Sequence, residues 1–126
     1  MKILLIPGDG VGSELAAELQ KLISAVQSLF ELKISTQTLD ISELHFRDTN
    51  ILVPKAFNKM AREADTIWLG PILNQSNLKG YTRKNIIQQI CSMQGFEFYY
   101  RHFKPLPSLQ KIQTDNPIDI LLIENN

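Results

Sequence analysis

The chain has 126 residues, of which 44% are hydrophobic and 21% charged, a composition typical of one ordinary globular domain. Thirteen basic residues balance thirteen acidic ones, so the net charge disfavours nucleic acid or an anionic membrane as a partner. A local patch of charge that binds such a partner is not excluded. No apolar run reaches the ~20 residues of a membrane-spanning helix, and the single cysteine, Cys91, excludes an internal disulfide, so we expect a reducing, cytoplasmic setting.

The first third of the chain has the pattern of a strand, a helix and a second strand. Residues 2–6 form a short apolar run before a Pro-Gly turn, as in a strand buried on both faces. Residues 32–39 alternate as a half-buried strand does. Between the two, apolar residues recur at spacings of three and four and predict an amphipathic helix of about five turns: Leu15, Leu19, Leu22, Val26 and Leu29, widened by Ala16, Ile23 and Phe30. This order predicts a parallel βαβ unit.

The remaining chain alternates in a similar way. Residues 40–50 follow no period, and we expect them to be irregular. Pro54 begins a predicted helix that ends at Ala64. The further predicted elements are a strand over 64–71, a polar loop over 74–80, a helix over 82–93, and β-prone runs over 96–103 and 118–123. The alternation predicts an α/β fold with three layers and a largely parallel sheet.

A glycine-rich turn between the first strand and the first helix is a candidate binding loop. Gly8, Gly10 and Gly12 carry no Cβ, so a phosphate could approach the backbone at the helix start. The dinucleotide fingerprint G-x-G-x-x-G would need a glycine where Ser13 stands, and no Gly-Lys-Ser/Thr follows. Asp9 adds negative charge to the loop. Local spacing alone therefore favours glycines that merely turn the chain.

The whole string around these glycines is more specific. Residues 6–12, Ile-Pro-Gly-Asp-Gly-Val-Gly, resemble the opening I-P-G-D-G-I-G of the β-decarboxylating dehydrogenases, the isocitrate and isopropylmalate dehydrogenase family. Three further matches follow in order: residues 64–71 resemble A-D-A-[apolar]-L-G, 99–107 resemble A-N-L-R-P-x-K-x-x-P, and 118–125 resemble D-[apolar]-V-I-V-R-E-N. The chain is identified as a short, divergent version of the N-terminal portion of this family.

The resemblance implies an activity and a set of contacts. Members of the family oxidise a 2-hydroxy acid with NAD or NADP and decarboxylate it with a divalent cation, Mg²⁺ or Mn²⁺. The matched positions imply cofactor contacts at Val11, Leu69, Gly70 and Pro71, and a substrate carboxylate contact at Arg101. The family's proton-transferring tyrosine and lysine, its metal-binding aspartates and most of its adenosine site come later in those proteins. We therefore expect no catalytic residue, no metal and no cofactor for the isolated chain.

Two of the three arginines that grip the substrate in this part of the family are replaced. Aligned on Arg101, the first falls at Cys91 and the third at Glu124. A carboxylate at position 124 would repel a dianionic substrate. A solvated or ion-paired strand arginine explains Arg101 at least as well.

Two functions stay open. The first is a catalytically inactive dehydrogenase-like protein, a pseudoenzyme or remnant that acts through binding or assembly. The second is one part of a split NAD(P)- and metal-dependent 2-hydroxy-acid oxidative decarboxylase that another chain completes. In either case we expect residues 1–126 to form a single truncated domain with exposed apolar surface. Its partner would be a second copy or a complementary dehydrogenase-like chain.

Overall fold

The computed structural model describes residues 1–73, 76–96, 98–103 and 120–125. The chain divides into two compact units, Met1–Gln94 and Gly95–Asn126. The expectation of a single domain over residues 1–126 stays a prediction. Asn74 and Gln75 of the predicted polar loop lie outside the described residues.

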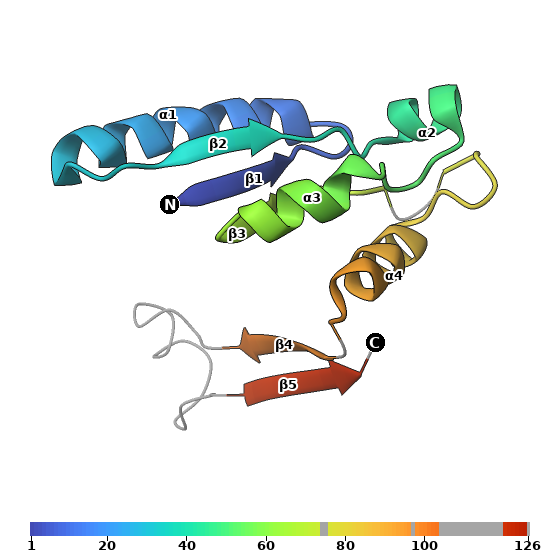
Figure 1. Ribbon diagram of the computed structural model, residues 1–126. Coiled ribbons are helices and arrows are strands. Elements are labelled where there is room, and N and C mark those ends of the chain that lie inside the picture. Colours follow the sequence, from blue (N-terminus) through green and yellow to red (C-terminus); the bar gives the residue numbers. More distant parts are fainter. Residues whose placement is uncertain (74–75, 97, 104–119, 126) are drawn as a thin grey trace, which may run out of the picture. The chain divides into compact units, whose positions relative to one another are not determined.

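The first unit is built on a parallel sheet with the strand order β2-β1-β3 (Figure 1). Strand β1 is Lys2–Ile6, β2 is Ser35–Thr38 and β3 is Thr66–Leu69. β1 lies in the centre and pairs in parallel with both neighbours. The last three residues of β1 are at most 1% exposed. The uninterrupted apolar run of this strand is explained by its central position, and the predicted βαβ unit is confirmed.

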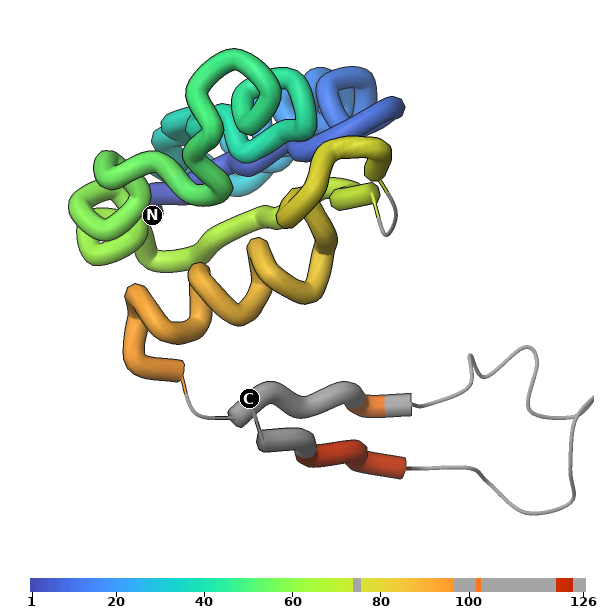
Figure 2. The backbone as a smooth tube through the Cα atoms, turned by 90° about the vertical axis from the view of Figure 1, so that its right-hand side faces the viewer, coloured from blue at the N-terminus to red at the C-terminus, as the bar shows by residue number. Residues whose placement is uncertain are grey.

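Helices cover both faces of this sheet (Figures 1 and 2). They are α1 (Gly12–Phe30), α3 (Ala56–Glu63) and α4 (Arg83–Gln94). Leu4 and Ile6 belong to one hydrophobic core with Phe57 of α3 and Ile86 of α4. Leu5, the residue between them in the strand, points to the opposite face, which α1 covers. This arrangement confirms the predicted three-layer α/β class. No helix in the described part of the chain is long and apolar enough to cross a membrane.

A further helix, α2 (Glu43–Thr49), occupies a stretch that the sequence pattern predicts to be irregular, so that prediction is wrong. Polar contacts, and no apolar period, define its ends. The Ser42 hydroxyl accepts a hydrogen bond from the His45 N–H at 3.1 Å. Asn50 adopts a left-handed conformation and donates its N–H to the Phe46 carbonyl at 2.7 Å. Caps of this kind stabilise a short helix without an amphipathic pattern.

Helix α1 is confirmed, but only one side of its apolar arc is buried. The buried residues are Gly12, Ala16 and Ile23. Leu15, Leu22 and Leu29 expose 47%, 60% and 76% of their surface. At about 100° per residue, the apolar arc spans roughly 140° of the helix circumference, more than the sheet covers.

The second unit contains an antiparallel two-stranded ribbon. Strand β4 is Phe98–Phe103 and β5 is Ile120–Asn125, so both predicted β-prone runs form strands with shifted bounds. Ile118 and Asp119 lie outside the described residues. Four consecutive residues of β5, from Ile120 to Ile123, each expose at least 41% of their surface. Because successive residues of a strand point to opposite faces, β5 is apolar on both faces.

Candidate functional site

Two loops lie side by side at the carboxyl ends of the neighbouring strands β1 and β3. The Gly70 N–H donates to the Ile6 carbonyl at 2.8 Å, and the Asp9 N–H donates to the Pro71 carbonyl at 2.7 Å. Because the chain passes from β2 on one side of β1 to β3 on the other, these loops flank the point at which the strand order reverses. Ligands of open α/β sheets bind at such a point. The loops therefore form the candidate site.

Glycines allow the two loops to approach each other. A Cβ at Gly8 would collide with the Pro71 carbonyl oxygen, and one at Gly12 or Gly70 with the Pro7 carbonyl oxygen. Gly10 is different, because no atom lies within 4 Å of a Cβ built there, and its φ of +56° favours glycine. Three of the four glycines thus serve backbone packing, as local spacing predicts, and they do not open a cradle for a phosphate.

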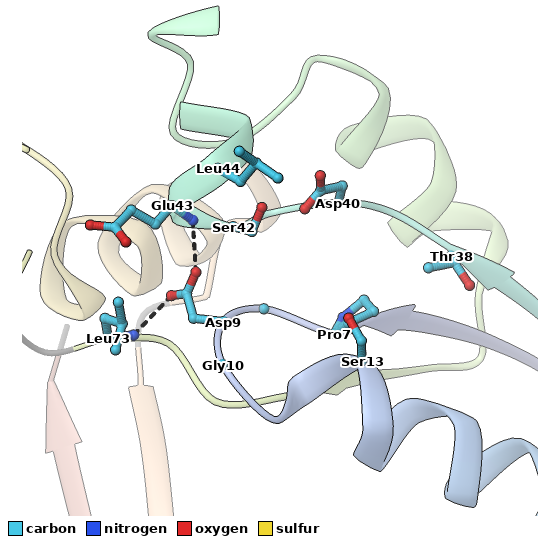
Figure 3. A pocket seen from close by; sticks show the side chains of 11 residues that line it. Pro7, Asp9, Gly10, Ser13, Thr38, Asp40, Ser42, Glu43, Leu44 and Leu73 are labelled. Carbon is cyan, nitrogen blue, oxygen red and sulfur yellow. Dashed lines mark hydrogen bonds between the residues drawn. The ribbon is translucent and has the colours of Figure 1, made fainter. Parts of the chain in front are cut away.

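The Asp9 carboxylate forms hydrogen bonds to two segments that are distant in the sequence (Figure 3). Its side chain accepts the Glu43 N–H at 2.7 Å and the Leu73 N–H at 2.9 Å. The Tyr81 hydroxyl donates to the same carboxylate at 2.7 Å. Asp9 is only 7% exposed, and three donors on one buried carboxylate replace the water that it loses. The residue therefore joins the β1–α1 loop to the start of α2 and to the segment between β3 and α4.

Tyr81 is held in its neutral form by this contact. Burial, its hydrogen bond to Asp9 and the negative charge of Asp9 raise the pKa of the Tyr81 hydroxyl well above its ordinary range. The ring also packs against Phe46 of α2, with the two centroids 5.5 Å apart. Tyr81 is thus a hydrogen-bond donor to Asp9 and has no role as a proton acceptor at neutral pH.

A pocket of about 420 Å³ opens beside Gly10 (Figure 3). Thr38 and Asp40 contribute from the end of β2, and Glu43 from the start of α2. The Glu43 carboxylate accepts a hydrogen bond from the Ser76 hydroxyl. The other residues that line the pocket are Pro7, Gly8, Asp9, Ser13, Ser42, Leu44 and Leu73. Three of the lining residues are acidic and none is basic, so the pocket attracts cations or hydroxyl groups more than anions.

The described residues do not form a complete site for the groups that the family resemblance implies. The acidic pocket has none of the predicted cofactor residues in its lining, and three of the four loop glycines pack against carbonyl oxygens. Among the described residues, no group of three His, Cys, Asp or Glu side chains could hold a metal ion. We therefore derive no chemistry through either group from this chain's residues.

The structure brings the predicted cofactor residues together and leaves their role a prediction. Val11 is 58% exposed at the N-terminal end of α1, and Leu69, Gly70 and Pro71 follow one another on the adjoining loop. Arg101 belongs to the second unit, in β4 opposite Leu122.

Sequence reasoning missed Asp9 and Tyr81 as the residues that organise the site. The signal for Asp9 was an acidic residue between glycines in a loop that follows a buried strand. Tyr81 gave no local signal, because it is 72 residues from its partner.

Comparison with known proteins agrees with the motifs. Residues 2–126 match the family model described as isocitrate/isopropylmalate dehydrogenase. The 3-isopropylmalate dehydrogenase of Chromobacterium violaceum is 33% identical over 72 residues, which is 57% of this chain and 20% of that protein. The corresponding enzyme of Thermobifida fusca is 28% identical over 107 residues, which is 84% of this chain and 29% of that protein.

Solved structures show the same fold. A β-decarboxylating dehydrogenase from Thermococcus kodakarensis in its apo form matches 99% of this chain and 33% of its own, with a TM-score of 0.70 and 18% identity. The TT0538 protein from Thermus thermophilus matches 99% of this chain and 24% of its own, with a TM-score of 0.73 and 20% identity. The chain therefore spans between 20% and 33% of the length of these four proteins.

Proposed function

This chain belongs to the isocitrate/isopropylmalate dehydrogenase family, and we propose that it is a catalytically inactive member that acts through binding or assembly. The observation that carries this proposal is the register of the β4–β5 ribbon. Tyr99 lies opposite Glu124, and Arg101 lies opposite Leu122. Position 124 is thus two residues along β5 from the position opposite Arg101.

That juxtaposition changes the chemistry of the substrate-binding positions. With arginines at both positions, as the family resemblance implies, a dianionic substrate would meet two cations. With Glu124 in place of the second arginine, the substrate would meet one cation and one anion there, so attraction at one position is offset by repulsion at the other. We also place this protein in the cytoplasm, on the ground of its single cysteine.

Substrate binding tests the proposal. Isothermal titration of the chain with 3-isopropylmalate or isocitrate should show no saturable binding at millimolar concentrations. The variant Glu124→Arg restores the cation that is missing from the ribbon and should bind the dianions at least about tenfold more tightly than the unmodified chain, as one good charge-assisted contact allows.

Glu124→Gln is the matched control, because it removes the negative charge without adding a cation. It should improve affinity by less than Glu124→Arg does. Tight, saturable binding of either dianion by the unmodified chain would refute the proposal, since Glu124 would then not oppose the substrate.

A second function is favoured by two other observations. The loops that carry Val11 and Leu69–Pro71 keep the side-by-side arrangement that a cofactor contact would require. Strand β5 is apolar on both faces, as is typical of a strand that lies inside a larger sheet. Both features fit a chain that supplies part of a split NAD(P)-dependent oxidative decarboxylase and is completed by a complementary dehydrogenase-like polypeptide.

Reconstitution tests this alternative. A 3-isopropylmalate dehydrogenase that lacks the segment matching this chain would be mixed with the chain, NAD, Mg²⁺ and 3-isopropylmalate. The split-enzyme function predicts NADH formation that depends on both polypeptides and that Val11→Asp lowers, while Ser24→Asp on the exposed side of α1 has no effect. Absence of complex formation between the two polypeptides would count decisively against it.

A further inference from the structure

We draw no further inference here: the strongest candidate, the acidic pocket beside Gly10 at the carboxyl ends of β1 and β2, carries nothing because Asp9 and Glu43 already accept hydrogen bonds within the chain and nothing in the described part of the structure shows what ligand would fill it.

Discussion

Asp9 is the residue on which the first unit most depends. Its carboxylate meets a backbone N–H from residue 43, another from residue 73 and the hydroxyl of Tyr81, and all three donors come from more than 30 residues away. Hydrogen bonds to a charged acceptor are stronger than neutral ones, and a buried carboxylate without donors is costly. Asp9 therefore stabilises the fold by joining the glycine loop to distant parts of the chain.

We expect Asp9→Asn to destabilise the fold by about 2–4 kcal/mol, because the amide keeps one acceptor oxygen and turns an NH₂ group toward N–H donors. Urea denaturation measures the free energy of unfolding. Asp40→Asn is the matched control. Asp40 lines the same pocket but is exposed, so its change should stay within about 0.5 kcal/mol. Equal costs for the two variants would contradict the assigned role of Asp9.

Because of Tyr81, the stability that the Asp9 contacts contribute depends on pH. The pKa of its hydroxyl is raised in the folded state, first by burial and then by Asp9, so the folded chain holds this proton more tightly than the unfolded chain does. The resulting stability is complete below about pH 10, the ordinary tyrosine pKa, and is lost as the pH rises above it. Tyr81→Phe should cost about 1–2 kcal/mol at neutral pH, and its disadvantage should shrink above about pH 10. A difference that stays constant from neutral pH to above pH 10 would rule out this coupling.

At the scale of elements, the contact between the β1–α1 loop and the segment after β3 requires glycine at some positions and only prefers it at others. Gly12→Ala should cost about 2–4 kcal/mol, because the new Cβ collides with the Pro7 carbonyl oxygen. Gly10→Ala should cost about 1–2 kcal/mol, because only its positive φ opposes a side chain. Thermal or urea unfolding separates the two cases. A larger loss for the Gly10 variant would show that the two loops do not pack as described.

The sequence predicts those helices and strands whose apolar residues follow a recognisable pattern. The run at residues 2–6, the period of α1 and the strand before Gly70 are each visible locally, because burial against the sheet determines their residue types. Helix α2 is not visible in this way, since its stability comes from Ser42 and Asn50 at its ends. The part of α1 that is buried is also not predictable, because the sheet covers only one side of an apolar arc.

The candidate site was likewise predictable from the sequence only in part. The motif around Gly8–Gly12 and the Leu69–Pro71 segment is recognisable from sequence, and the structure places these loops together. The contacts of Asp9 join positions separated by 34 to 72 residues, which no local period encodes. The register that sets Arg101 opposite Leu122 and Tyr99 opposite Glu124 likewise becomes visible only in the structure.

At the scale of the whole molecule, the chain carries the fold of a decarboxylating dehydrogenase over a fraction of the length of its relatives. Its described residues include an acidic pocket beside Gly10, and its sequence has Glu124 where the family resemblance implies an arginine. The proposal of a catalytically inactive member rests on that charge reversal. Absence of turnover by the chain alone is therefore the central prediction.

The most direct test is the reduction of NAD or NADP by the purified chain with 3-isopropylmalate or isocitrate and Mg²⁺ or Mn²⁺. A 3-isopropylmalate dehydrogenase under the same conditions serves as the positive control. The account predicts no reduced nucleotide above the rate without protein, in any combination of substrate, nucleotide and cation. Sustained turnover that follows the concentration of the chain, and that Arg101→Ala abolishes, would contradict it.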